Sequence, residues 1–471
     1  MDIAVLRRKL PEFGQGHVLR FYDSLDSSGR QNIVRQLQAQ DLQNIADLAR
    51  THVRVKPTIA LPNRIEPVCP FPHQPDALRR PLYDEARRRG RELLADGKVG
   101  AFLVAGGQGT RLGYDGPKGE YPITPVKNKP LFQVFAEQLL AHGRRAGRTI
   151  PWYIMTSDIN NMQTRAFFHK NHFFGYEEDS VFFFQQGMMP AFSMDGRLVL
   201  SERDSLALSP DGHGGSLRAL EKSGALADMR RRGVEHLSYF QVDNPLVYCI
   251  DPLFLGLHDI TGSEMSSKTL PKVNPMERVG NFVIGDGLLQ VIEYSDLPES
   301  LATQTHPDGT LRFNAGSIAI HALRVSFIER LNAGGRLALP WHRAEKKVPF
   351  LDDRGLLVKP DKPNAVKLEQ YVFDAIPLAQ NALVYSTERW DEFSPVKNAE
   401  GVDSPETCRR DQIRRAARWL RDAGMDVPYR GKEPDMKIEI SPLRAVSAED
   451  LRARPLPTRQ LKSGASLYIG E

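Results

Sequence analysis

The sequence predicts an α/β protein built on a doubly wound, mostly parallel mixed sheet. Two observations lead to this fold class. Short apolar runs recur through the middle of the chain, at residues 99–105, 152–155, 181–184, 237–242 and 313–320. Stretches with helical spacing separate several of these runs, for example at 130–145 and 216–232. Strands that alternate with helices favour a parallel sheet covered by helices.

Smaller domains are expected on both sides of this core. Residues 1–95 have helical periodicity and include a connector rich in proline between Pro57 and Pro81, which excludes a helix interior there. Residues 401–471 contain a candidate helix and a single apolar strand. We therefore expect an N-terminal helical domain with its connector (1–95), a catalytic α/β domain (96–400) and a small C-terminal α+β domain (401–471).

Composition narrows the class of protein. Of the 471 residues, 41% are hydrophobic and 26% are charged, as in ordinary globular proteins. No apolar stretch approaches the ~18 residues that a membrane span requires, and we expect no secretion signal. Three cysteines without a CxxC pair do not fit a disulfide framework or a cysteine zinc site, so we expect a cytoplasmic location.

The net charge of +5 is a small excess for a chain of this length. It is compatible with an anionic small molecule and does not require nucleic acid. We expect neither a nucleic-acid partner nor a membrane partner. The sequence does not decide between a monomer and a homo-oligomer.

The strongest local signal is the glycine-rich segment LVAGGQGTRLG at residues 103–113, followed by PKG at 117–119. An apolar strand ends at Ala105, and the glycines after it can direct successive N–H groups at one anion. Arg111 and Lys118 add two cations, a combination that suits a polyphosphate.

The glycine spacing excludes two common phosphate-binding motifs. The GxxxxGK[ST] pattern is absent, and Gly107, Gly109 and Gly113 are one residue too far apart for the dinucleotide fingerprint. A dehydrogenase is therefore disfavoured. From this loop alone, phosphate binding and a purely structural turn both remain open.

Further motifs follow the glycine loop. In chain order they are FFQQGMMP (183–190), PDGHGG (210–215), QVDNPL (241–246), VIEYS (291–295), FNAG (313–316), EKKVP (345–349), AVKLE (365–369) and EFSPVKN (392–398). The series resembles the UDP-sugar pyrophosphorylases, nucleotidyltransferases that join UTP to a sugar 1-phosphate. It is most similar to the UDP-N-acetylhexosamine (UDP-N-acetylglucosamine) pyrophosphorylase branch, strongly over 99–400 and more weakly beyond.

The resemblance implies a Rossmann-like, GT-A-like nucleotidyltransferase fold and assigns roles to individual residues. It implies UTP, a sugar 1-phosphate, a UDP-sugar and pyrophosphate as the small-molecule partners, and Mg²⁺ as the cofactor. The implied catalytic residues are Arg111, Lys118 and Lys397. The implied nucleotide-binding residues are Gly106, Gly107, Gln186, Gly212 and Asp243, and Asp243 is also the implied metal ligand. The implied residues for the sugar and its phosphate are His213, Gly280, Glu293, Asn314, Ser317, Lys367, Tyr371 and Phe373.

Without the resemblance, these residues have ordinary structural explanations. Gln186 is compatible with a solvated loop, and Asp243 before Asn-Pro with a turn. A single lysine such as Lys367 is most often solvated surface. Tyr371 and Phe373 are nearly as well explained by core packing.

Two positions depart from the branch pattern, and both concern the sugar. His213 stands where the eukaryotic pattern has asparagine in PDGNGG, and Ser317 stands where it has asparagine in NAGNI. The shorter serine cannot reach as far, and an unpartnered buried amide costs ~1–3 kcal/mol. N-acetylglucosamine 1-phosphate is the expected substrate. Glucose 1-phosphate, galactose 1-phosphate and N-acetylgalactosamine 1-phosphate remain open.

Two alternatives to this function remain open. One is a UDP-glucose or broad-specificity UDP-sugar pyrophosphorylase. The other is a non-catalytic regulator that binds nucleotide sugars, and the retained Arg111, Lys118, Asp243 and Lys397 argue against it. The sequence leaves open the role of the N-terminal helices and any regulation.

Overall fold

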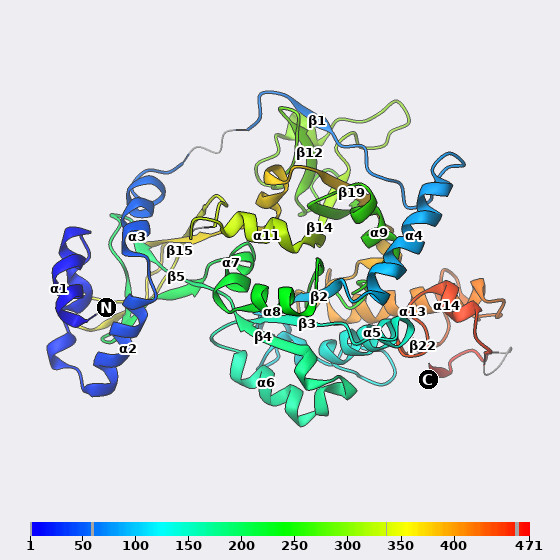
Figure 1. Ribbon diagram of the computed structural model, residues 1–471, viewed down its shortest axis with the longest axis horizontal. Helices are drawn as coiled ribbons and strands as arrows, with labels where there is room; N and C mark the ends of the chain where they lie inside the picture. Colours follow the sequence, from blue (N-terminus) through cyan, green and yellow to red (C-terminus); the bar gives the residue numbers. More distant parts are fainter. Residues whose placement is uncertain (1, 58–60, 336, 457–460) are drawn as a thin grey trace. The chain divides into compact units, whose positions relative to one another are not determined.

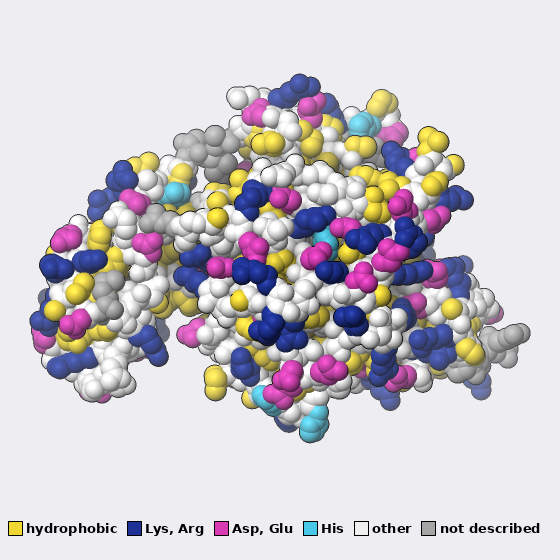
Figure 2. Space-filling model, viewed as in Figure 1, with side chains coloured by type: hydrophobic (Ala, Val, Ile, Leu, Met, Phe, Trp, Pro, Cys, Tyr) yellow, Lys and Arg dark blue, Asp and Glu magenta, His cyan; other side chains and the backbone are white. Residues whose placement is uncertain are grey.

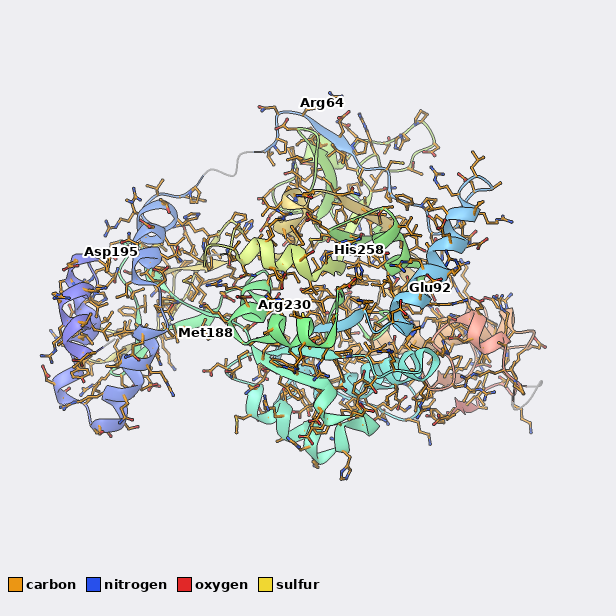
Figure 3. The ribbon with its side chains drawn as sticks, viewed as in Figure 1. Arg64, Glu92, Met188, Asp195, Arg230 and His258 are labelled. Atoms are coloured by element: carbon orange, nitrogen blue, oxygen red, sulfur yellow. The ribbon has the colours of Figure 1, made fainter. Side chains whose placement is uncertain are left out.

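The computed structural model describes residues 2–57, 61–335, 337–456 and 461–471 (Figure 1). Its contacts divide the chain into two compact units. Unit 1 comprises Met1–Leu61, Gln186–Arg218 and Leu337–Asp374, and unit 2 comprises Pro62–Gln185, Ala219–Arg336 and Ala375–Glu471. Of the side chains labelled in Figure 3, Met188 and Asp195 belong to unit 1, whereas Arg230 and His258 belong to unit 2.

Unit 2 is built on a ten-stranded mixed sheet in the order β1-β12-β14-β10-β2-β3-β4, with β11, β13 and β19 attached outside this path. The strands are β1 (Ile65–Pro67), β2 (Val99–Val104), β3 (Trp152–Thr156), β4 (Val181–Gln185), β10 (His236–Gln241), β11 (Met265–Pro271), β12 (Asn281–Gly285), β13 (Leu288–Ile292), β14 (Ala315–Arg324) and β19 (Ala382–Ser386). Strands β10, β2, β3 and β4 are parallel, and β14 pairs antiparallel to β10. The predicted α/β fold class is confirmed, and every apolar run named above forms a strand.

Helices of unit 2 connect these strands. They are α4 (Arg80–Ala95), α5 (Leu131–Ala146), α6 (Asn161–Lys170), α8 (Ala225–Arg232), α9 (Pro252–Ile260), α10 (Glu299–Ala302), α11 (Val325–Asn332), α12 (Arg389–Glu392), α13 (Pro405–Asp422) and α14 (Ala448–Arg452). The single helix expected over 216–232 is instead two, α7 (Gly215–Lys222) and α8. Gly224, between them, has φ +82°, a left-handed conformation that interrupts a helix.

The C-terminal part of unit 2 has a small apolar core of its own. Side chains of α13, including Trp419 and Leu420, pack with Ile438 and Ile469. Ile438 lies on β22 (Lys437–Ile440) and Ile469 on β23 (Ser466–Ile469), which pair in parallel. A short hairpin, β20 (Tyr429–Arg430) with β21 (Glu433–Pro434), precedes them.

Unit 1 joins the N-terminal helices to two later segments of the chain. Its helices are α1 (Ile3–Glu12), α2 (Ser27–Gln38) and α3 (Leu42–Leu48). Its strands are β5 (Met188–Pro190), β6 (Phe192–Ser193), β7 (Leu200–Glu202), β8 (Ser205–Leu206), β9 (Leu208–Pro210), β15 (His342–Lys346), β16 (Phe350–Leu351), β17 (Leu357–Val358) and β18 (Ala365–Glu369). Leu10 and Leu37 share one apolar cluster with Phe192 and Leu368. The two units are defined by packing, and unit 1 includes two segments from within 96–400. They do not correspond to the three predicted domains, whose boundaries at 95 and 400 stay a prediction.

Among the described helices, none combines the length and the apolar composition of a membrane span. On the face shown in Figure 2, basic and acidic side chains are intermingled, in keeping with the small net charge.

Candidate active site

The glycine-rich loop and Asp243 follow two neighbouring parallel strands of unit 2. The loop follows β2, Asp243 follows β10, and Val104 pairs with Gln241 at the carboxyl ends of these strands. The chain leaves β2 toward β3 on one side and later returns as β10 on the other. Ligands of open α/β sheets bind at such a switch in strand order, outside the carboxyl ends of the strands.

Backbone hydrogen bonds fix the shape of the glycine loop. The N–H of Gly109 donates to Gly116 O at 2.8 Å, and the N–H of Lys118 donates to Gly107 O at 3.1 Å. A Cβ on Gly109 would lie 2.9 Å from Tyr114 Cβ, whereas a Cβ on Gly107 would meet no atom within 4 Å. Packing therefore requires glycine at 109. At 107, beside the partly exposed Gly106, the loop leaves open space that a ligand can approach.

Three cations and one carboxylate gather beside this loop. The Lys118 amine donates to Val396 O at 3.2 Å, and the Val396 N–H donates to Asp243 O at 2.7 Å. Burial lowers the pKa of the Lys118 amine; Asp243 opposes this effect, whereas Arg111 and Lys397 lower the pKa further. The structure thus brings Arg111, Lys118, Asp243 and Lys397 together, and the excess of positive charge suits a polyphosphate.

A second carboxylate, which the sequence analysis missed, belongs to this group. The N–H of Lys397 donates to Asp403 O at 2.7 Å, so the turn that carries Lys397 closes on Asp403. Burial raises the pKa of the Asp403 carboxyl, Lys397 opposes the rise and Asp243 adds to it. Asp403 lies just outside the EFSPVKN motif, so no local pattern pointed to it.

The Asp243 carboxylate fits a divalent cation. It is partly exposed, and no residue in the described part of the chain donates a hydrogen bond to it. The described residues contain no group of three or more His, Cys, Asp or Glu able to hold a metal. Mg²⁺ commonly binds through one or two carboxylates, with substrate phosphates and water completing its shell. The open Asp243 carboxylate beside Arg111, Lys118 and Lys397 is compatible with this mode of binding.

A buried ion cluster supports the segment that carries Lys397. The Lys268 amine, on β11, donates to Asp251 Oδ2 at 2.7 Å and to both oxygens of Glu392 at 2.7 and 2.8 Å. Glu392 ends α12 and lies five residues before Lys397. Asn244 adds a second connection, since its amide donates to Glu392 O and its oxygen accepts from the Ser394 N–H. The residues of this cluster lie far apart in the sequence, so no local pattern indicated it.

Four of the predicted sugar-binding residues lie around β12, β13 and β14 of unit 2. The N–H of Ser317 donates to Gly280 O at 2.8 Å, and a Cβ on Gly280 would lie 3.4 Å from Glu293 Oε1. Gly280, Glu293 and Ser317 are therefore neighbours. Asn314 directly precedes β14, and its carbonyl accepts from the N–H of Lys272 at 2.9 Å.

The other predicted ligand residues lie in unit 1, where the PDGHGG segment folds against Gln370. Gly212 has φ +88°, and a Cβ there would lie 2.3 Å from Gln370 O. The fold therefore requires this glycine, and its role toward the uracil stays a prediction. The N–H of Gly214 donates to Gln370 O, and the N–H of Gln370 donates to Asp211 O, both at 2.8 Å.

His213, Tyr371 and Phe373 form an aromatic group in unit 1. The ring of Tyr371 stacks on His213 at 5.3 Å and on His342 at 4.3 Å, and Phe373 is tilted against both His213 and Tyr371. His342 in turn contacts Asp374 Oδ2 at 2.7 Å. Sequence reasoning missed His342 and Asp374, since neither belongs to a motif of chemical interest.

The hydrogen bonding of His213 fixes its tautomer. Its Nδ1 accepts from the Val372 N–H at 3.1 Å, so the ring proton sits on Nε2. Burial lowers the pKa of His213 to about 4, and the nearby His342 contributes. In the described part of the chain, no residue accepts from Nε2. The ring is thus neutral near pH 7 and can donate a hydrogen bond to a ligand.

Gln186 and Lys367 are less closely tied to these groups. Gln186 is a partly exposed residue between β4 and β5. Lys367 lies on β18 between the buried Val366 and Leu368, so its side chain points to the opposite face of that strand. Among the described residues none forms an ion pair with Lys367.

Comparison with known proteins agrees with this geometry. The family model that matches residues 72–402 is described as UTP–glucose-1-phosphate uridylyltransferase. The chain belongs to this family. UDP-N-acetylhexosamine pyrophosphorylase-like protein 1 of Xenopus tropicalis is 37% identical, covering 95% of this chain and 93% of that protein. UDP-N-acetylglucosamine diphosphorylase 2 of Arabidopsis thaliana is 35% identical, covering 95% and 91%.

A solved structure has the same fold as this chain. The crystal structure of the uridine diphosphate N-acetylglucosamine pyrophosphorylase from Trypanosoma brucei matches with a TM-score of 0.82 at 26% identity, covering 99% of this chain and 98% of that one. The family, the fold class and the uridylyltransferase class predicted from the sequence are confirmed.

Proposed function

We propose that this uridylyltransferase joins UTP to N-acetylglucosamine 1-phosphate and releases pyrophosphate. The observation that carries the proposal is the group of Arg111, Lys118 and Lys397 around the open Asp243 carboxylate, at the switch point of the sheet. The names of the relatives support this choice of sugar.

The chemistry needs charge compensation and alignment rather than a general base. The second pKa of a phosphate monoester is ~6, so the attacking sugar phosphate is already largely dianionic at neutral pH. Its oxygen attacks the α-phosphorus of UTP in line with the departing pyrophosphate. Like charges ~4 Å apart repel by several kcal/mol at the effective dielectric of proteins. Arg111, Lys118 and Lys397 would offset this repulsion and hold the phosphates in position.

Mg²⁺ is part of the proposal, with Asp243 as its protein ligand. A bound Mg²⁺ would neutralise phosphate charge in addition to the three side-chain cations. Asp243 raises the pKa of the nearby Asp403 carboxyl, and Lys397 opposes that rise. The cations Arg111, Lys118 and Lys397 outnumber the carboxylates Asp243 and Asp403, which leaves positive charge for the substrates' phosphates.

The sugar assignment concerns His213 and Ser317. We propose that His213 donates from Nε2 to the sugar, where the branch pattern has an asparagine amide. Ser317 offers a shorter hydroxyl beside Gly280 and Glu293. These two replacements are the specific reason to keep a second candidate, a UDP-glucose or broad-specificity UDP-sugar pyrophosphorylase.

Replacing the two loop cations tests the proposal. Arg111→Ala and Lys118→Ala should each lower turnover by about 10²–10³-fold, because each removes a group that stabilises phosphate charge. Pyrophosphate release from UTP and N-acetylglucosamine 1-phosphate is the measurement, and thermal unfolding checks that each variant is folded. Lys98→Ala is the matched control, since Lys98 lies on the surface in an ion pair with Glu235. Near-wild-type turnover in both loop variants would contradict the role of this loop.

A further inference from the structure

A second cationic pocket lies in unit 2, along α13 and outside the glycine loop. Its volume is about 590 Å³. Arg410, Arg414, Arg418 and Arg421 of α13 all line it. Their spacing of four, four and three residues places them on one face of the helix, drawn in orange in Figure 1.

Several of the cations in this pocket have no carboxylate partner. Six cationic side chains line it against two carboxylates, those of Glu388 and Asp411. Within the described residues, Arg418, Arg421 and Lys432 form no ion pair. An anion can therefore bind these three groups without displacing a carboxylate from them.

Two aromatic rings lie among these cations. The Arg418 guanidinium lies 4.2 Å from the ring centre of Trp390, and that of Arg421 lies 5.5 Å from the ring of Tyr429. Tyr429 is 38% exposed. In many nucleic-acid-binding sites, aromatic rings stack the nucleobases while neighbouring cations hold the phosphates. The pocket volume falls in the ~300–1,000 Å³ range of small-molecule sites.

The pocket is also connected to the segment that carries Lys397. Asp411 accepts a hydrogen bond from the Ser394 hydroxyl at 2.9 Å, and Arg414 donates to the other oxygen of Asp411 at 3.1 Å. Ser394 lies three residues before Lys397. Arg414 is also paired with Glu433, to which its Nε donates at 2.8 Å. A ligand that draws Arg414 away from these two carboxylates changes the charge around Asp411 and hence the support of this segment.

We propose that this pocket is a second nucleotide site, which binds a nucleoside triphosphate and alters turnover through Asp411 and Ser394. The free arginines and Lys432 hold the phosphates, and Trp390 or Tyr429 stacks the base. Binding at this site does not depend on the proposed reaction, so its failure and the failure of that reaction can be told apart.

Equilibrium binding of ATP tests the site. Arg418→Glu combined with Arg421→Glu should weaken ATP binding at least tenfold. Arg430→Glu is the matched control, since Arg430 neighbours Tyr429 and does not line the pocket, and it should stay within twofold of wild type. Arg111→Ala should also stay within twofold, because the glycine loop is not involved. If the double variant does not fold, Arg418→Gln with Arg421→Gln replaces it.

Three results would overturn the site. They are equal ATP binding by wild type and the double variant, loss of binding in Arg111→Ala, and competition by tripolyphosphate as strong as that by ATP. The last result would mean that the aromatic rings do not recognise a base.

The effect of this site on the reaction is tested by turnover at saturating UTP. ATP should change turnover by at least twofold in wild type and should leave turnover of the double variant unchanged. Unchanged turnover of wild type with ATP bound would refute the coupling through Asp411 and Ser394.

Discussion

Replacing Lys268 by methionine should destabilise unit 2 severely. The Lys268 side chain is 1% exposed, and its amine contacts the carboxylates of Asp251 and Glu392. Burial lowers the pKa of this amine, but the two carboxylates outweigh that effect and leave the pKa raised, so the amine stays charged. Methionine keeps the apolar stem and removes the charge. The variant would leave two buried carboxylates without their cation.

The expected cost follows from the burial of these partners. Breaking a buried ion pair by removing one member costs about 3–5 kcal/mol, because the other charge remains desolvated. Glu392 is 1% exposed, and its carboxylate keeps two neutral donors, the Thr387 hydroxyl at 2.8 Å and the Tyr248 N–H at 3.3 Å. Asp251 keeps the N–H groups at the start of α9. We therefore expect a loss near the upper end of the range, with most of it arising at Glu392.

Urea unfolding followed by circular dichroism measures the change. Adding Glu392→Gln to Lys268→Met should recover part of the lost free energy, since glutamine carries no charge to bury. Lys98→Met is the matched control: the Lys98–Glu235 pair is 2.5 Å long but exposed, and it should contribute at most about 1 kcal/mol. The reasoning is refuted if Lys268→Met falls within about 1 kcal/mol of wild type, or if the double variant is no more stable than the single one.

Two further predictions concern histidines. His213→Asn should shift the ratio of turnover with N-acetylglucosamine 1-phosphate to that with glucose 1-phosphate, and an unchanged ratio would count against a sugar contact by His213. Burial lowers the pKa of His142 and of His213 from 6.5 to about 4. Between these values the unfolded chain binds more protons, so the stability contributed by neutral histidine is complete above pH 6.5 and is lost as the pH falls toward 4. The urea midpoint should thus be lower at about pH 5 than at about pH 7, and His142→Phe should flatten part of this dependence.

The sheet of unit 2 could be predicted because its strands are locally apolar. Trp152 and Ile154 are fully buried, and such continuous runs are typical of strands covered on both faces. The position of Asp243 at a strand end followed directly from the run before it. The break between α7 and α8 was missed, because helical periodicity continues across Gly224 and only its backbone conformation ends the helix.

The grouping of distant residues could not be predicted from local patterns. Glu392 begins the EFSPVKN motif, but Lys268 and Asp251 lie in segments with no recognisable motif, and only the folded chain brings the three together. Similarly, His342 belongs to no motif, and its stacking on Tyr371 became visible only in the folded chain. The sequence analysis also did not predict which segments form unit 1. Its apolar core joins the N-terminal helices to residues 186–218 and 337–374, which lie far along the chain.

The most direct test of the proposed function is pyrophosphate release from UTP and Mg²⁺, measured in parallel with N-acetylglucosamine 1-phosphate and glucose 1-phosphate. The account predicts a large preference for N-acetylglucosamine 1-phosphate, with His213 and Ser317 still accommodating an acetamido sugar. A preference for glucose 1-phosphate would contradict the sugar assignment. No release with either sugar, in folded protein that binds UTP, would contradict the catalytic role of Arg111, Lys118 and Lys397 in this reaction.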